Sequence, residues 1–323
     1  MLSTAGWIEG RGWDQNDWAV KEFPTKDLLD AAFPNNPVYL IRIDGHAALV
    51  NSEALKRAGI THKTKVTGGE VLLEGREPTG LLIDNAMDIV LAAIPDVDED
   101  FIRRALLSAQ ENCFAVGLTS VGDAGLGRDT VLLIDKMQQE GDLKMRIYAM
   151  LSPSNENLAH FVANGPYETD QLTVRSVKLY ADGALGSRGA KMIEPYSDDP
   201  DNTGLFMYPA AYYYDLCNRA YDNNYQVNAH AIGDGGNRFL LDTYAEFLEA
   251  GNDRRWRIEH AQIVHPDDFQ KFGAYGIIPS VQPTHATSDM YWAEERVGPD
   301  RIKGGYAFKQ LLDENGWIPL GTD

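Results

Sequence analysis

The stretch VRSVKLYADG, residues 174–183, decides how this chain is expected to fold. Side chains alternate across a β-strand, so Val177 and Leu179 share one face while Lys178, Tyr180 and Asp182 share the other. If the apolar face packs against helices, Lys178 points into the interior of a curved sheet. A buried ammonium group costs free energy unless it is paired or neutralised. The stretch therefore predicts a buried strand that carries a lysine in an unusual environment.

Similar strand candidates lie on both sides of this stretch and alternate with segments of helical pattern from about residue 96 onward. Strand and helix in repeated alternation predict a parallel sheet with crossover helices. The expected strands are 118–123, 143–151, 174–183, 225–233, 255–263, 276–285 and 316–323. The expected helices are 96–117, 129–140, 210–223, 235–250, 266–274 and 303–314. We therefore predict an α/β fold of the TIM (β/α)8-barrel type, which is incomplete because a closed barrel needs an eighth strand.

Residues 1–95 differ from the rest in being rich in Trp, Gly, Asp and Pro and in lacking a regular period. They contain short strand-like runs such as 38–43. We predict that 1–95 is an inserted subdomain that shapes the mouth of the active site, and that 96–323 carries barrel strands 2–8.

Composition narrows the classes of partner. The formal net charge of −19 repels phosphate backbones and anionic lipid, so neither nucleic acid nor a membrane surface is an expected partner. No run approaches the ~18 apolar residues of a membrane span. Two cysteines make neither a disulfide framework nor a zinc finger, and both are expected to be buried free thiols. The sequence specifies no compartment, and the cytoplasm is only the default.

Polar residues collect where the expected strands end. Barrel enzymes place their chemistry at the carboxyl ends of the strands, so these residues are predicted to share one site. They are Asp123, Lys178 with Asp182, His230, His260, Gln282 with His285, and Asp323.

Two interpretations of Lys178 follow from its burial. The lysine either pairs with a carboxylate such as Asp182 or Asp323, or it reacts with CO2 and becomes a carbamate that binds a metal. His230 and His260 likewise are either hydrogen-bonded core histidines or ligands. Two imidazoles and a carbamate on adjacent strands would form the three-ligand set of a catalytic zinc site.

Two carboxylates have predicted roles beside this set. Asp323 is predicted to accept a proton from metal-bound water. Asp234 is predicted to orient one of the imidazoles from outside the ligand set. Both lie near strand ends in the expected fold.

Nine stretches along the whole chain form a recognisable set: GRGWDQ (10–15), PVYLIRIDGHAALVNSEAL (37–55), PTGLL (78–82), GLTSVGDAG (117–125), VKLYADGALGSR (177–188), HAIGD (230–234), RIEHAQ (257–262), SVQPTH (280–285) and LGTD (320–323). Taken in this order, they resemble the YtcJ-like metal-dependent hydrolases of the amidohydrolase superfamily, the amidohydrolase 3 type. The resemblance implies a TIM barrel, metal ligands Lys178 as carbamate, His230, His260 and Asp323, and Asp323 as the catalytic residue. It also implies a divalent metal, most simply zinc, and hydrolysis of a non-peptide carbon–nitrogen bond by metal-activated hydroxide.

One family motif is missing. The family carries a His-x-His pair on its first barrel strand, and none of the seven histidines here forms such a pair. Members also have a β-sandwich built from both termini, which this sequence lacks. We therefore expect a chain truncated at both ends that holds one metal at most, where the complete enzyme holds one or two. Its exposed sheet edges invite pairing with another chain, so a homo-oligomer is a candidate state.

Four residues are candidates for contact with a small-molecule substrate. His46 and His285 are candidate oxyanion or substrate contacts, Gln282 is expected to shape the pocket, and Arg188 is a candidate for binding a carboxylate. Structural hydrogen bonds or salt bridges are the alternatives for these residues. The glycine-rich loop at 181–189 matches no phosphate-binding motif and is predicted to form tight turns at the barrel mouth.

Two alternatives to the hydrolase remain open at this point. The chain is otherwise a catalytically incompetent fragment of such a hydrolase, or a metal-free barrel enzyme that uses Lys178 as a Schiff base. The sequence does not identify the substrate.

Overall fold

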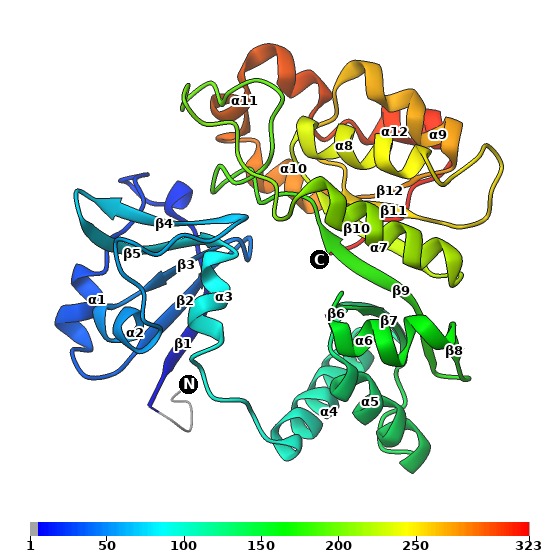
Figure 1. Cartoon of the computed structure of the whole chain (residues 1–323), viewed down its shortest axis with the longest axis horizontal. Coiled ribbons are helices and arrows are strands. Elements are labelled where there is room, and N and C mark those ends of the chain that lie inside the picture. The colour runs from blue at the N-terminus through cyan, green and yellow to red at the C-terminus, as the bar shows by residue number, and fades with distance from the viewer. Residues whose placement is uncertain (1–5, 323) are drawn as a thin grey trace.

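The computed structural model of the chain describes residues 6–322 and contains two β-sheets (Figure 1). The first sheet has five strands in the order β1-β2-β3-β5-β4, of which β1 and β2 run parallel and the other neighbours antiparallel. Its strands are β1 (Ile8–Trp13), β2 (Val38–Arg42), β3 (Ala47–Val50), β4 (Gly69–Glu74) and β5 (Glu77–Asp84).

Short helices surround the first sheet and close its core. Helix α2 begins because the Asn51 side chain accepts the N–H of Ala54, which satisfies one of the free amide groups at a helix start. Trp7 and Tyr39 are almost fully buried in this core. The helical segments are η1 (Gln15–Asp17), α1 (Asp27–Ala32), α2 (Ser52–Arg57) and α3 (Ala86–Leu91).

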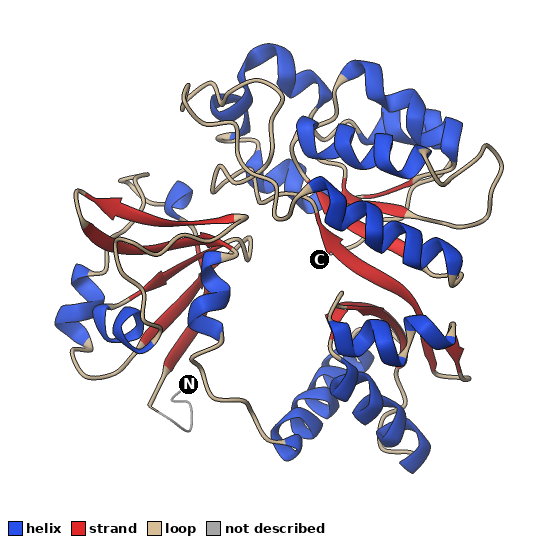
Figure 2. Cartoon of the chain, in the orientation of Figure 1, coloured by secondary structure: helices blue, strands red, loops and turns tan. Residues whose placement is uncertain are grey.

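The second sheet is parallel along the order β12-β11-β10-β9-β7-β6, with the short β8 antiparallel beside β9. The sheet curls, and helices cover its outer face (Figure 2). Its strands are β6 (Ser120–Leu126), β7 (Arg146–Leu151), β8 (Tyr167–Glu168), β9 (Leu172–Tyr180), β10 (Gln226–Ala231), β11 (Arg257–His260) and β12 (Ile278–Ser280).

The helices of this half precede, connect or follow the parallel strands. They are α4 (Glu99–Ala115), α5 (Arg128–Glu140), α6 (Asn155–His160), η2 (Val162–Asn164), α7 (Ala210–Asp222), α8 (Asp234–Ala245), η3 (Pro266–Asp268), α9 (Phe269–Tyr275), α10 (Pro283–Asp289), α11 (Ala293–Arg301), η4 (Ile302–Gly304) and α12 (Phe308–Asn315). Helix α4 comes before β6, α5 to α9 lie between successive strands, and α10 to α12 come after β12.

The main core lies between the parallel sheet and its helices. Val177 and Leu179 of β9 belong to it, together with Tyr213 of α7, Tyr244 of α8 and Trp256, all almost fully buried. The apolar face of β9 therefore faces helices, as the alternation in VRSVKLYADG predicts. The opposite face, which carries Lys178, is turned into the curve of the sheet.

The expected α/β class with a curled parallel sheet is confirmed, and six of the seven expected strands form. The seventh, 316–323, was wrong for the described part: Leu320 makes only an isolated parallel bridge to Val281. The end of the sixth was also wrong. Strand β12 stops at Ser280, and Pro283 begins α10, because proline has no N–H to donate to a sheet and suits the first turn of a helix.

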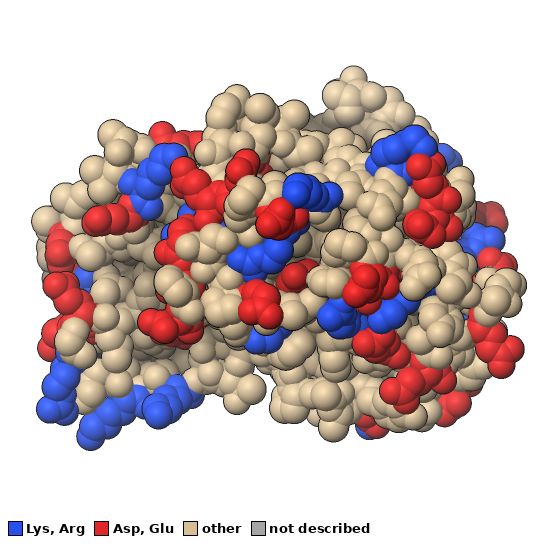
Figure 3. Space-filling view, turned by 90° about the horizontal axis from the view of Figure 1, so that it is seen from above, with Lys and Arg blue, Asp and Glu red and all other residues tan. Residues whose placement is uncertain are grey.

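Three further features concern membrane-spanning helices, the charges on the surface and the two cysteines. Within residues 6–322 no helix has the length and apolar character needed to cross a membrane. Acidic side chains are scattered over the face seen in Figure 3, with lysines and arginines in small groups between them. Both cysteines are free and lie in helices; Cys217 is buried as expected, whereas Cys113 is only partly buried.

Candidate active site

Two histidines at the carboxyl ends of neighbouring strands form the centre of the site. His230 is the last residue but one of β10, and His260 is the last residue of β11. In the ladder between these strands, Ala231 pairs with His260. Their ring centroids are 4.6 Å apart, and both side chains are buried. The prediction that these strands bring the two imidazoles together is therefore correct in geometry.

The neighbours of the His230 ring indicate which of its two nitrogens carries the proton. Its Nε2 lies 3.2 Å from the carbonyl oxygen of Gly183 and 3.5 Å from Oδ1 of Asp182. Both neighbours are acceptors, so Nε2 carries the proton and the lone pair is on Nδ1. Burial lowers the pKa of His230 well below its ordinary value, and the charges of His260, His46 and Lys178 lower it further. His230 is thus a neutral imidazole at neutral pH.

The backbone turns sharply at His260. His260 and Ala261 have φ values of 78° and 42°, in the left-handed region that residues with a side chain seldom adopt. In a regular strand His260 would face the same way as Ile258, which is buried in the core between sheet and helices. The left-handed turn redirects the imidazole toward His230. Such costly backbone conformations are characteristic of functional sites.

Gln282 contacts the ring of His260. Its Oε1 lies 2.6 Å from His260 Nδ1, and its own amide nitrogen points to the carbonyl oxygen of Ser280 at 3.5 Å. The amide oxygen thus accepts the Nδ1 proton of His260 and places the lone pair of that ring on Nε2. Gln282 is 5% exposed. The structure thus shows Gln282 in contact with His260, a predicted ligand.

Lys178 lies one strand away from His230 and is 5% exposed. In the ladder of β9 and β10 it pairs with Asn228, two residues before His230. Its Nζ lies 4.5 Å from the ring centroid of Tyr180, and that ring is 5.6 Å from the ring of His230. Tyr180 was not predicted to be part of the site, although it shares the Lys178 face of the strand.

His46 reaches this centre from the first sheet. Its ring centroid is 4.7 Å from that of His230 and 6.4 Å from that of Tyr180. Its Nδ1 lies 2.6 Å from Oδ1 of the fully buried Asp84. Burial lowers the pKa of His46, but the hydrogen bond and charge of Asp84, with Asp44 and Asp182, outweigh this and raise it above the ordinary value. Asp84 was missed because no local pattern distinguishes it from other strand-ending aspartates.

The Asp182 side chain, next to this cluster, binds backbone groups of two loops. Its carboxylate accepts backbone N–H groups of Ile232, Gly233 and Lys191, at 3.0, 2.9 and 2.8 Å. Burial raises its pKa to about 7, although these three donors lower it. Asp182 therefore connects the loops that follow β9 and β10.

Three further predicted residues lie at or beyond the edge of the cluster. The His285 ring stacks on that of His260 with centroids 5.7 Å apart, so His285 does join the site. Asp234 accepts the backbone N–H of Ile193 at 2.8 Å and so holds the 183–193 loop, in place of the predicted contact with an imidazole. Arg188 pairs with Asp198 at 2.8 Å, which is the structural salt bridge foreseen as its alternative. Asp323 lies outside the described residues.

Comparison with known proteins places this site in a family. A family model described as the amidohydrolase family matches residues 3–323. The chain belongs to the amidohydrolase family. The YtcJ-like resemblance is confirmed by the putative amidohydrolase YtcJ of Bacillus subtilis (strain 168), 32% identical over 100% of this chain and 62% of that protein.

Other relatives of this amidohydrolase carry varied names. Protein LONG AFTER FAR-RED 3 of Arabidopsis thaliana is 35% identical over 98% of this chain and 57% of its own length. The N-substituted formamide deformylase of Arthrobacter pascens is 27% identical over 84% of this chain and 52% of its own length. Among solved structures, an uncharacterised metal-dependent hydrolase from Pyrococcus horikoshii OT3 has a TM-score of 0.75 at 28% identity, covering 98% of this chain and 62% of that one. This amidohydrolase chain thus spans about three fifths of the length of the first two relatives.

The residues of this amidohydrolase that line the centre fit a metal. Nδ1 of His230 and Nε2 of His260 are the ring atoms left with lone pairs, and a neutral imidazole is the form that ligates. Between residues 6 and 322, no three His, Cys, Asp or Glu side chains form a metal-binding group on their own. The predicted ligand set differs from such a group, because its third donor is a lysine carbamate and not a His, Cys, Asp or Glu side chain. Two oriented imidazoles beside a buried lysine match that set.

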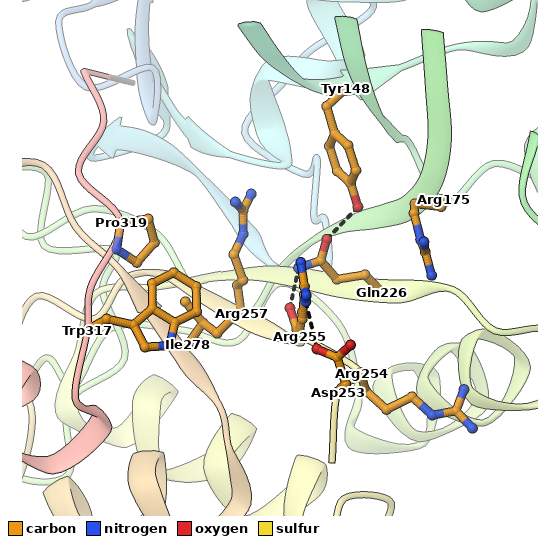
Figure 4. A pocket seen from close by; sticks show the side chains of 10 residues that line it. All are labelled: Tyr148, Arg175, Gln226, Asp253, Arg254, Arg255, Arg257, Ile278, Trp317 and Pro319. Carbon is orange, nitrogen blue, oxygen red and sulfur yellow. Dashed lines mark hydrogen bonds and ion pairs between the residues drawn. The ribbon is translucent and has the colours of Figure 1, made fainter. Parts of the chain in front are cut away.

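One cavity in the described part of the chain lies away from the histidines. A cavity of about 400 Å³ opens at the amino-terminal ends of the parallel strands, opposite the histidines (Figure 4). Its arginines already have partners: Arg257 pairs with Glu259 at 2.6 Å, and Arg254 donates to Tyr221 O at 3.0 Å. Glu259 thus belongs to an ion pair on this side of the sheet. This end of the sheet is separate from the histidine cluster.

Proposed function

We propose that this chain carries the metal site of a hydrolase that cleaves non-peptide carbon–nitrogen bonds in small molecules. Lys178 as its carbamate, His230 and His260 would hold a divalent metal, with zinc as the first candidate. Asp323 would join this set as the group that accepts a proton. When bound, such a metal lowers the pKa of water and polarises a carbonyl group.

One observation carries the proposal. His230 and His260 lie with ring centroids 4.6 Å apart, and each ring has one nitrogen against an acceptor, the carbonyl of Gly183 or the amide oxygen of Gln282. Metal-binding histidines characteristically donate their second ring N–H to such a group, which fixes tautomer and orientation. A pair of core histidines held only by packing would not need an acceptor on one nitrogen of each ring.

The chemical class of substrate rests on similarity. Solved relatives are titled metal-dependent hydrolases, and one relative is an N-substituted formamide deformylase. Removal of a formyl group from an N-substituted formamide breaks an amide C–N bond. We therefore propose amides and cyclic ureas as the first substrates to test, with carbon dioxide supplied for the carbamate.

Residues around the cluster would bind and orient the substrate. The ring of His46 lies beside that of His230 and the ring of His285 beside that of His260, with centroid distances of 4.7 and 5.7 Å. We propose that residues 1–95 shape the mouth of the site, because they supply His46. Each of the two outer imidazoles would donate a hydrogen bond from a ring N–H to the oxygen of the reacting carbonyl group.

Metal content per chain tests the proposal. The protein is loaded with zinc in the presence of bicarbonate, dialysed, and measured by elemental analysis together with Lys178→Ala. About one zinc per chain that is absent from Lys178→Ala supports the site. Arg175→Ala, at an exposed position on the same strand, is the matched control and should retain the metal.

A mass increase of one carbon dioxide on Lys178, seen in native mass spectrometry, would identify the carbamate directly. A folded wild-type protein that retains no zinc, cobalt or manganese contradicts the proposal. A substrate adduct trapped on Lys178 by borohydride would instead support Schiff-base chemistry.

A further inference from the structure

The loop that follows β9 carries three glycines at a spacing of three residues, Gly183, Gly186 and Gly189. The sequence predicts tight turns here, but none of the three has a φ in the positive region that requires glycine. A different reason must account for them. Each of the three lies against a charged side chain from the first sheet.

The contact distances show that a side chain at any of these positions would displace the charged group beside it. A Cβ atom at Gly183 or Gly189 would lie 2.4 or 2.5 Å from Oδ2 of Asp84. A Cβ at Gly186 would lie 2.9 Å from Nη1 of Arg42. Carbon atoms do not approach oxygen or nitrogen this closely without displacement, so the glycines provide the space that Asp84 and Arg42 occupy.

Both charged residues are held firmly on their own side. The Arg42 side chain is about 2% exposed, pairs with Asp14 and Asp44, and donates from Nε to Gln15 at 2.9 Å. Asp84 ends β5 with a left-handed φ of 49° and a fully buried side chain. This buried carboxylate, on a strained backbone position, reaches the loop after β9.

The two oxygens of Asp84 have different neighbours. Oδ2 enters the space between Gly183 and Gly189, and Oδ1 accepts the Nδ1 proton of His46 at 2.6 Å. The position of the His46 ring thus depends on how deeply Asp84 enters the loop. The same loop supplies the Gly183 carbonyl that accepts from His230.

We propose that Gly183, Gly186 and Gly189 form a seat for Asp84 and Arg42, and that this seat positions His46 beside His230 to contact the substrate. Asp84 is the positioning residue, and His46 is the group that touches the substrate. The substrate role of His46 rests on the proposed function, whereas the seat does not. If the seat served packing alone, it would stabilise the fold, and Asp84 would not influence the orientation of the His46 ring.

A double-mutant cycle tests the seat without any metal or substrate. Gly189→Ala, Asp84→Ala and the double variant are unfolded in denaturant, with Gly127→Ala as the control because nothing lies within 4 Å of a Cβ there. Gly189→Ala should lower the denaturation midpoint clearly, and at least half of that loss should disappear when Asp84 is already alanine. An equal loss in both backgrounds overturns the seat.

Nitrogen-15 NMR of the ring nitrogens tests the positioning of His46, again without metal. In the wild-type protein the Nδ1 of His46 should be protonated and hydrogen-bonded. Asp84→Ala should change this signal, and Asp84→Asn should largely retain it because the amide oxygen still accepts a hydrogen bond. A His46 signal that is the same in Asp84→Ala and in the wild type overturns the positioning role.

Kinetics of the metal-loaded protein test the contact with substrate. His46→Gln and Asp84→Ala should each lower kcat about 100-fold, the loss typical of removing one oriented hydrogen-bonding group, and the double variant should lose little more. Zinc content should be unchanged in all three. Full kcat in His46→Gln overturns the contact, whereas a wild-type protein without zinc overturns the proposed function and leaves the seat to be judged by the first two experiments.

Discussion

The amide of Gln282 offers the sharpest test of the ligand geometry. Gln282→Leu removes the acceptor for the Nδ1 proton of His260 and keeps an apolar side chain of comparable size. The buried Nδ1–H then has no partner, which costs free energy. The ring relieves this cost by moving its proton to Nε2, the atom that would ligate the metal. We therefore expect Gln282→Leu to weaken metal binding and not only to destabilise the fold.

The magnitude follows from the contact that is lost. Removing the hydrogen-bond partner of a ligand histidine typically lowers metal affinity about 10- to 100-fold, or roughly 1.4–2.8 kcal/mol. The 2.6 Å distance between Nδ1 and Oε1 and the 5% exposure of Gln282 argue for the upper half of this range. Gln282→Glu retains an acceptor and should bind zinc at least as tightly as the wild type.

The assay is a competition between the protein and a chromophoric zinc chelator at constant bicarbonate. Gln138→Leu is the matched control: this glutamine is 8% exposed, bonds the carbonyl of Met145 at 2.9 Å and lies on α5 away from the histidines. It should lose stability and keep its zinc affinity. Equal zinc affinity in Gln282→Leu and in the wild type, both fully folded, would refute the assignment of the His260 proton.

Three further predictions concern stability. Gly204→Ala should lower the free energy of unfolding by roughly 3 kcal/mol, because its Cβ would lie 1.9 Å from Ala190 O, whereas Gly141→Ala, with open space around it, should cost only about 1 kcal/mol; urea titration measures both. Leu240→Ala in the fully buried core should cost about 2–5 kcal/mol, and Leu132→Ala, which is 42% exposed, much less in the same titration. Burial raises the pKa of Asp198, but Arg188 and Arg296 outweigh this effect and hold the pKa below its ordinary value. The ion pairs therefore stabilise the fold fully at pH values above the unfolded pKa of about 3.9. This contribution is lost as the pH falls through the lower pKa of the folded state. Asp198→Asn should therefore destabilise the protein at pH 7 and show a smaller further loss than the wild type below pH 4; an unchanged acid limb would contradict the pairing.

Much of the parallel sheet was predictable because its signals are local. The alternation at Val177, Lys178 and Leu179 reports which face meets the helices, and this depends only on neighbours in the chain. The strand at 316–322 was overestimated because its apolar residues match a strand, while ladder formation depends on a partner that composition does not reveal. Pro283 marked the true end of β12.

The site was predictable only in part, for a related reason. His230 and His260 lie at ends of adjacent parallel strands, so their proximity follows from topology. The role of Gln282 did not follow, because the chain turns at Ser280 and sends this side chain back to His260. The left-handed backbone at His260 likewise breaks the alternation on which strand reasoning depends.

The sequence by itself determined the family, the α/β class and the residues that the parallel strands bring together, because period-two and helical patterns record local contacts with a core. Only the tertiary structure decided that His46 and Asp84 belong to the same cluster, and that three glycines of one loop make room for Asp84 and Arg42. These contacts join residues more than 90 positions apart on two separate sheets. They depend on how the loop after β9 and the end of β10 meet the first sheet, which no local periodicity records.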